Sequence, residues 1–115
     1  MSENRERCDV GLKKQQGIQS VKFEEPPSIC AAAAVVEQKE GDGPFGDVFD
    51  QIESDPKVGG DTWEDAEGRL QERAAELAIQ KAGCGKEAIR YIVAGDLLGQ
   101  LMASSFGLAG FDKPL

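Results

Sequence analysis

The fold is decided by residues 61–99, which read DTWEDAEGRLQERAAELAIQKAGCGKEAIRYIVAGDLLG. Asp61 is a residue type that accepts hydrogen bonds from the free N–H groups at a helix start, and Glu64 follows three residues later, as in a capping box. Gly83 is the residue type that most often ends a helix, because it adopts a left-handed conformation at little steric cost. These signals predict a single helix over residues 61–82.

Apolar residues recur at helical spacing along one side of this segment. They are Trp63, Ala66, Leu70, Ala74, Leu77 and Ala78. We expect Trp63, Leu70 and Leu77 to pack inward. Residues 89–94 (IRYIVA) are β-branched and aromatic, which is typical of a strand. A helix followed by a buried strand is half of a parallel βαβ unit, so we predict an α/β fold.

The composition of the chain is that of a small globular domain or of part of a larger one, with 115 residues and 40% hydrophobic residues. Its net charge of −8 is concentrated in residues 37–72, where twelve acidic residues face three basic ones. No basic stripe is available for a phosphate backbone, so we expect no nucleic-acid partner. The acidic segment is either a solvated face or a surface for cations or a basic protein.

No run approaches the 18 or so apolar residues of a membrane span, and the first ten residues lack the apolar core of a secretory signal. The chain has three cysteines, Cys8, Cys30 and Cys84, without a CxxC pair, and no histidine. We therefore expect free thiols in a reducing compartment, with Cys30 as a small buried residue, and no metal site. Without histidine, neither a Ser-His-Asp nor a Cys-His pair can form in this chain, so we expect no enzyme activity and no cofactor.

The chain before the central helix divides into a polar lead-in, residues 1–20, and a domain that we expect to span residues 21–115. Residues 21–23 predict a short strand, which Pro26 and Pro27 stop. Residues 29–35 lie in an alanine-rich run that is compatible with a strand, a helix or a turn. Residues 37–60 predict loops around one short helical turn, and their glycines match neither a nucleotide-binding nor an EF-hand pattern.

After Gly95, apolar residues at helical spacing predict a second helix over residues 97–106. Asp96 is placed to cap this helix. Asp96 also stands at the carboxyl end of the predicted strand, where ligands collect in open α/β sheets. Capping and ligand binding are therefore both open for Asp96.

Three segments in order, GDGPFGDVFD, WEDAEGRLQERAAELAIQKAG and IRYIVAGDLLGQ, resemble the N-terminal part of the stage V sporulation protein AD family. The lead-in VKFEEPPSICAAAAVVEQKEGDGPFG is similar to the opening of that family, although residues 32–36 replace a glycine-containing stretch. The resemblance runs from about Val21 to the end. It implies a thiolase-like fold of two similar α/β halves, of which this chain is an N-terminal, truncated portion with an incomplete sheet and covering helices.

The resemblance also implies a role in sporulation. Family members bind dipicolinic acid, or its calcium chelate, and take part in its uptake into the developing spore, together with membrane proteins of the same operon. This implies a cytoplasmic or peripheral location at the inner spore membrane and a possible homodimer. Asp96 and Gln100 match the family's Gly-Asp-Leu-Leu-x-Gln turn, which lies near the ligand pocket, and are the candidate ligand-binding residues. The alternatives are a truncated thiolase-like acyltransferase and a small stand-alone interaction module.

Overall fold

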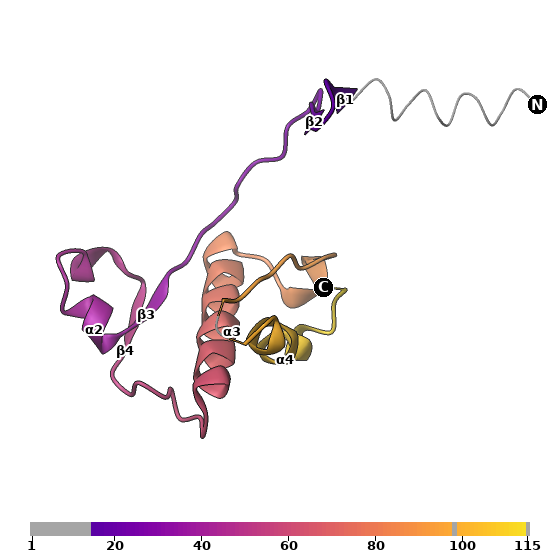
Figure 1. Ribbon diagram of the computed structural model, residues 1–115. Helices are drawn as coiled ribbons and strands as arrows, with labels where there is room; N and C mark the ends of the chain where they lie inside the picture. The colour runs from indigo at the N-terminus through magenta and orange to yellow at the C-terminus, as the bar shows by residue number, and fades with distance from the viewer. Residues whose placement is uncertain (1–14, 98, 115) are drawn as a thin grey trace, which may run out of the picture.

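The computed structural model describes residues 15–97 and 99–114, and it shows a mixed α/β chain (Figure 1). Its strands are β1 (Gln15–Gln16), β2 (Ser20–Val21), β3 (Val35–Glu37) and β4 (Gln51–Glu53). Its helices are α2 (Gln38–Gly41), α3 (Trp63–Ala82) and α4 (Met102–Gly107), with short 3-10 turns η1 (Gly46–Val48), η2 (Lys86–Ala88) and η3 (Ala109–Phe111). The predicted α/β class is confirmed at this level.

The small sheet of the body consists of β3 and β4, which pair in parallel. Val36 lies opposite Ile52, and the chain crosses from one strand to the next through α2 and η1. The carboxylate of Asp50, directly before β4, accepts a 2.9 Å hydrogen bond from the Ala34 backbone N–H. This bond fixes the register, because a parallel pair of three residues has few ladder bonds of its own.

Helix α3 is the long helix that the sequence predicts, but it begins two residues later than expected. The cap is Thr62, not Asp61, and the acid that completes the capping box is Asp65, not Glu64. Thr62 Oγ1 accepts from the Asp65 N–H at 3.1 Å, and the Asp65 carboxylate accepts from the Thr62 N–H at 3.2 Å. The predicted end is confirmed, since Gly83 is left-handed with φ 67°.

Two ion pairs connect α3 to the sheet. Arg73 pairs with Glu53 at the end of β4, and Lys81 Nζ lies 2.6 Å from the carboxylate of Asp50. The Lys81 ammonium is the main cause that lowers the pKa of Asp50. The lysine side chain thus reaches from the last turn of α3 to the residue that sets the register of β3 and β4.

Helices α3 and α4 pack closely because glycine faces glycine where they meet. A Cβ added to Gly107 of α4 would lie 2.4 Å from the carbonyl oxygen of Gly68 and 2.7 Å from its Cα. The buried residues of the molecule gather around this contact and at the ends of the two helices. They are Val58, Ala66, Gly68, Ala103, Ser104, Leu108 and Phe111.

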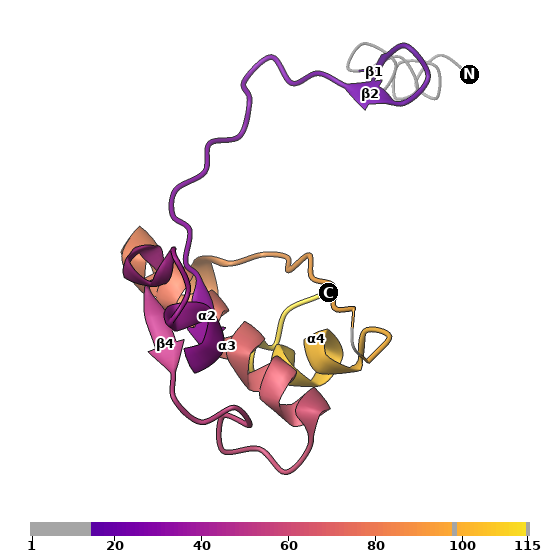
Figure 2. The same ribbon diagram turned by 60° about the vertical axis from the view of Figure 1, so that its left-hand side comes forward.

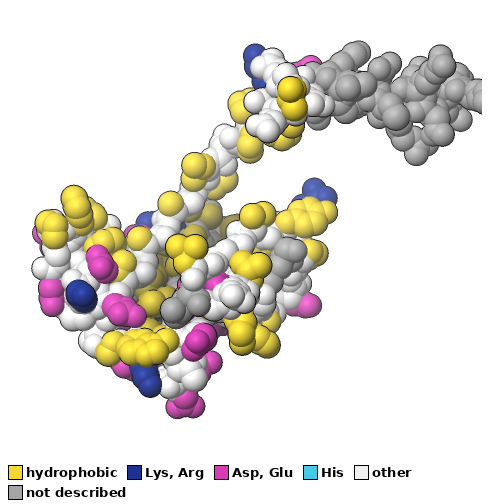
Figure 3. All heavy atoms as spheres, in the orientation of Figure 1, with side chains coloured by type: hydrophobic (Ala, Val, Ile, Leu, Met, Phe, Trp, Pro, Cys, Tyr) yellow, Lys and Arg dark blue, Asp and Glu magenta, His cyan; other side chains and the backbone are white. Residues whose placement is uncertain are grey.

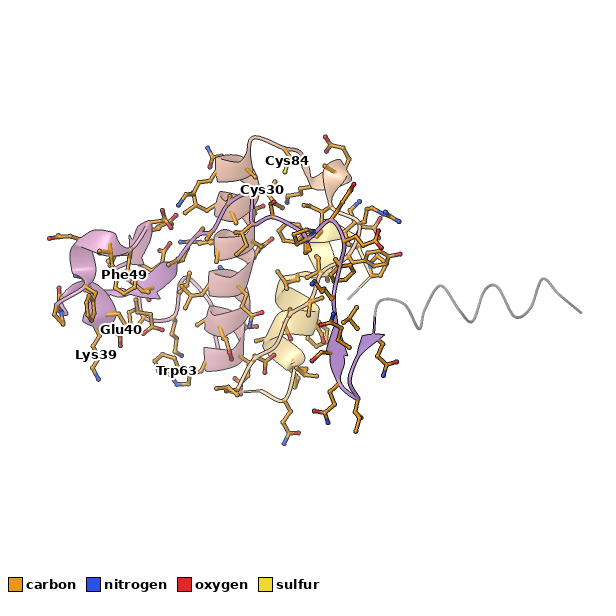
Figure 4. All side chains as sticks on the ribbon, turned by 90° about the horizontal axis from the view of Figure 1, so that it is seen from above. Cys30, Lys39, Glu40, Phe49, Trp63 and Cys84 are labelled. Atoms are coloured by element: carbon orange, nitrogen blue, oxygen red, sulfur yellow. The ribbon has the colours of Figure 1, made fainter. Side chains whose placement is uncertain are left out.

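Trp63 does not pack inward as predicted, since 55% of its surface is exposed. The Lys57 ammonium lies 5.8 Å from the centre of its ring, and Figure 4 places Trp63 on the side of α3 that is turned away from α4. Leu70 and Leu77 are half-buried. The prediction failed for Trp63 because the first turn of α3 extends beyond the small residues that form the contact with α4.

The predicted strand over residues 89–94 is wrong: this segment is extended but belongs to no sheet. One backbone bond ties it to another part of the described chain, from the Ile92 N–H to the Pro114 carbonyl at 2.9 Å. Tyr91 and Val93 are 68% and 99% exposed. A strand is stabilised by hydrogen bonds to its neighbours, and β3 and β4 pair with each other at a different place.

The chain before β3 is a long arm that leads away from the body and carries the β1–β2 hairpin at its far end (Figures 1 and 2). The strand predicted over residues 21–23 is corrected to β2 (Ser20–Val21), paired with β1. For residues 29–35, where the sequence leaves a strand, a helix and a turn all open, the structure shows an unpaired chain until β3 begins at Val35. Cys30 lies on this arm and is exposed, not buried. Of the polar lead-in, residues 1–14 lie outside the described part of the chain.

Candidate functional site

Asp96 is the centre of the turn that leads into α4. Its Oδ1 accepts a hydrogen bond from the Leu101 N–H at 2.8 Å, and its Oδ2 accepts from the Ser104 N–H at 3.0 Å and from Ser104 Oγ at 2.9 Å. The two N–H donors are among the backbone groups that the first turn of a helix leaves without partners. Asp96 thus satisfies backbone donors at the start of α4, as the sequence predicts, but it is not the N-cap residue, because Leu101 occupies that position.

Helix α4 begins at Met102, five residues later than the sequence predicts. The delay arises because Gln100 and Leu101 both adopt left-handed conformations, with φ of 52° and 72°. Such angles are uncommon outside glycine, and the bond from the Leu101 N–H to Asp96 helps to hold them. The structure thus brings Asp96 and Gln100 into one turn, with the Gln100 side chain at the surface.

The two acids nearest this turn have opposite electrostatic environments. The hydrogen bond from the Ser104 backbone is the main cause that lowers the pKa of Asp96. Burial raises the pKa of Glu67 on α3, and the Asp96 carboxylate adds to the increase. Glu67 Oε2 is buried and accepts no hydrogen bond from the described residues. A backbone hydrogen bond from Leu97 to Glu67 acts in the opposite direction, but the effect of burial on the pKa of Glu67 is larger.

A groove of about 460 Å³ lies between α3 and α4. Its α3 wall carries Glu64, Gly68 and Glu72, which are four residues apart and share one face. Its α4 wall carries Met102 and Phe106, also four residues apart. The remaining lining residues are Thr62, Asp65, Arg69, Ala103, Gly107 and Gly110.

The loop before α3 positions the one basic residue of this groove. Arg69 donates a 3.2 Å hydrogen bond to the carbonyl of Val58, which is buried and left-handed with φ 53°. Asp55 holds the loop by accepting from the Lys57 and Gly59 N–H groups at 3.0 and 2.6 Å. The sequence analysis missed this loop as a support of the groove. Its signal was an acid followed four and five residues later by glycines, beside the Asx turn that Asp55 forms.

No group of three metal-ligating side chains comes together within the described residues. Cys30 and Cys84 are free and exposed, and Figure 4 places both near the C-terminal end of α3, while Cys8 lies outside the described residues. Among the described helices, none combines the length and the apolar character needed to cross a membrane.

The fold and the site define a mixed α/β protein with an acid-capped turn of sequence Gly-Asp-Leu-Leu-Gly-Gln beside a helix pair. The family model described as stage V sporulation protein AD matches residues 17–115. A curated relative, stage V sporulation protein AD of Bacillus subtilis (strain 168), is 36% identical over 93 residues, which cover 81% of this chain and 28% of the relative. The chain belongs to the stage V sporulation protein AD family and matches well under a third of that relative's length.

Proposed function

We propose that this chain is the N-terminal part of a thiolase-like sporulation protein that binds dipicolinic acid and takes part in its uptake into the developing spore. The family match over residues 17–115 carries this proposal. It includes the turn with Asp96 and Gln100, which we expect near the ligand pocket from the resemblance to the family.

The role is that of binding and transport, without acyl-transfer chemistry. Acyl transfer by a thiolase-like enzyme needs a nucleophilic cysteine and a general base, usually histidine. The sequence has no histidine, and the described Cys30 and Cys84 form no hydrogen bond to a side chain that could act as a base. Incubating the chain with acetyl- and acetoacetyl-thioesters should release no thiol. Turnover that Cys30→Ala abolishes would favour the acyltransferase alternative.

Within this role, Asp96 organises the turn and does not itself hold the ligand. Dipicolinate is a dianion, and a buried carboxylate needs convergent donors or cations. The Asp96 carboxylate already accepts three hydrogen bonds, and like charge would repel the ligand. Gln100 has an exposed amide that can donate, so Gln100 is the stronger candidate of the two.

The chain alone should bind dipicolinate weakly or not at all, with or without calcium. Among the described residues that line the groove, Arg69 is the only cation, and it donates to the Val58 carbonyl with acids around it. Titration calorimetry of the purified chain measures this. We propose that cations from the parts of the family protein beyond this match complete the site. Membrane proteins of the same operon are the proposed partners in uptake.

A chimera tests the proposal directly. Residues 17–115 replace the matching segment of the Bacillus subtilis relative, and the intact relative serves as the positive control. We expect the folded chimera to bind dipicolinate within tenfold of the control and Gln100→Ala to weaken that binding. The chimera should also restore dipicolinic acid to spores of a strain that lacks the relative. A folded chimera without binding, beside a control that binds, would contradict the proposal.

A further inference from the structure

The groove between α3 and α4 keeps large apolar side chains at the surface. Phe106 and Met102, which form its α4 wall, are 76% and 53% exposed. On the α3 wall, no side chain projects into the groove at Gly68, between Glu64 and Glu72. Figure 3 shows hydrophobic and acidic side chains side by side over this part of the surface. An exposed apolar strip with a polar rim is typical of an interaction site.

The rim of the groove is acidic, and two of its carboxylates are free to pair with a cation. Glu64 and Glu72 stand one helical turn on either side of Gly68, and neither forms a hydrogen bond or an ion pair with any residue in the described part of the chain. Asp65 is occupied by the helix cap, and Arg69 is turned to the Val58 carbonyl. The two free carboxylates therefore frame the apolar floor.

The charge of the groove indicates the chemistry of its binding partner. A second copy of the chain, with a net charge of −8, would bring like charge to the groove, and so would an anionic lipid surface or a nucleic acid. A partner with apolar residues on one face and Lys or Arg beside them can pack against the apolar floor and form ion pairs with the acidic rim. A helix laid in a groove presents such a face through residues three and four apart.

We propose that the α3–α4 groove receives a basic amphipathic helix from a partner polypeptide. The α3 wall runs from Thr62 to Glu72, which is about 15 Å at 1.5 Å per residue. The occupant is thus a helix of about three turns. Two of its apolar residues lie against Met102 and Phe106, and its basic residues reach Glu64 and Glu72.

Two fluorescent peptides of about 14 residues test this surface by fluorescence anisotropy with the full chain. Both carry leucine at positions i, i+3, i+4 and i+7, and the remaining positions are lysine in one and glutamate in the other. We expect micromolar binding of the Leu/Lys peptide, weakened by salt, and binding at least tenfold weaker for the Leu/Glu peptide.

The variant that locates the site is Glu64→Gln with Glu72→Gln. Both changes keep the side-chain shape and remove two charges, and they should weaken the Leu/Lys peptide about three- to tenfold, given the usual strength of exposed ion pairs. The matched control is Glu40→Gln with Asp47→Asn, which removes the same charge from α2 and η1 and should change the affinity less than twofold. Phe106→Ser should weaken binding about tenfold or more, with circular dichroism to verify that the helices remain.

Equal effects of the groove variant and its control would overturn the proposal, because binding would then follow net charge alone. Equal binding of the two peptides would also overturn it, since the rim would have no role. Sedimentation of the chain alone tests whether a second copy of the chain occupies the groove. A dimer that Phe106→Ser dissociates, and that competes with the peptide, would assign the groove to a second copy of the chain.

Discussion

Two regions of the molecule carry comparably strong sequence signals: the helix pair α3–α4 and residues 89–94. The first forms regular, packed secondary structure, and the second does not. Helix α3 runs for 20 residues with a complete capping box and two ion pairs to the sheet. Residues 89–94 have the β-branched and aromatic composition of a strand and remain outside every sheet of the described chain.

The difference lies in where each element finds its hydrogen bonds. A helix satisfies its backbone within its own residues, and α3 needs only caps and one packed face. A strand satisfies its backbone only through a neighbour. Within the described chain, the Ile92 N–H is the one backbone donor of this segment that reaches a distant carbonyl, that of Pro114. Sequence signals for helices therefore predict structure more directly than signals for strands.

Hydrogen exchange should give the largest contrast between the two regions. We expect the amides in the middle of α3 to exchange at least about a hundredfold more slowly than those of residues 89–94, since local opening of an unpaired segment costs almost nothing. Within the segment, the Ile92 amide should be the slowest. Uniform protection of residues 89–94 would mean that they pair with another strand in solution.

Gly107→Ala should disrupt the packing of α3 against α4 and lower the free energy of unfolding. The added methyl group would lie within 2.7 Å of the Gly68 backbone, so the helices must separate, at a cost of about 1–3 kcal/mol. Denaturant unfolding followed by circular dichroism measures this. The control is Gly95→Ala, where a Cβ meets nothing within 4 Å. A neutral or stabilising effect at Gly107 would show that the α3–α4 contact does not exist in solution.

Leu77→Ala should cost about 2 kcal/mol, at the low end for a leucine, because Leu77 is half-buried and the neighbouring side chains can relax toward the gap. Trp63→Ala is the comparison on the same helix and should cost less than Leu77→Ala, because over half of the tryptophan is exposed. The same unfolding measurement serves both. A larger loss for Trp63→Ala would show that the first turn of α3 is packed.

The smallest effects concern the acids that join α3 to the turn. Hydrogen bonds lower the pKa of Asp96, so its contribution to stability is present above its ordinary pKa and is lost as the pH falls through the lowered value. Asp96→Asn should therefore lower the melting temperature at pH 7, with a difference that shrinks toward pH 3. Thermal unfolding at several pH values measures this.

Glu67→Gln is the opposite test, because burial raises the pKa of Glu67. Its ionisation costs stability as the pH rises above its ordinary pKa, and the cost is complete above the raised value. The amide should make the protein slightly more stable at pH 7 and leave it unchanged near pH 4. Destabilisation by Glu67→Gln at pH 7 would mean that the Leu97 backbone bond to the charged carboxylate outweighs the cost of its burial.

The sequence predicts α3 and its end well, because the apolar period and Gly83 are local signals. It misses the start by two residues, since residues 61, 62, 64 and 65 can all serve in a capping box and the backbone angles at Thr62 decide the choice. It finds that Asp96 accepts hydrogen bonds at the start of the second helix, but neither the start of that helix nor the donors. Leu101 and Ser104 become donors only through two consecutive left-handed residues that no local composition requires.

The exposed segment IRYIVA also has a consequence for handling the protein. A six-residue segment with four strong strand formers (two isoleucines, a tyrosine and a valine), a single charge and no proline has the signature of a segment that stacks into cross-β fibrils. Arg90 is the one charge in it, and its guanidinium carbon lies 5.7 Å from the centre of the neighbouring Tyr91 ring. Repulsion between stacked arginines opposes in-register growth, so Arg90 acts as a gatekeeper against fibrils at high protein concentration.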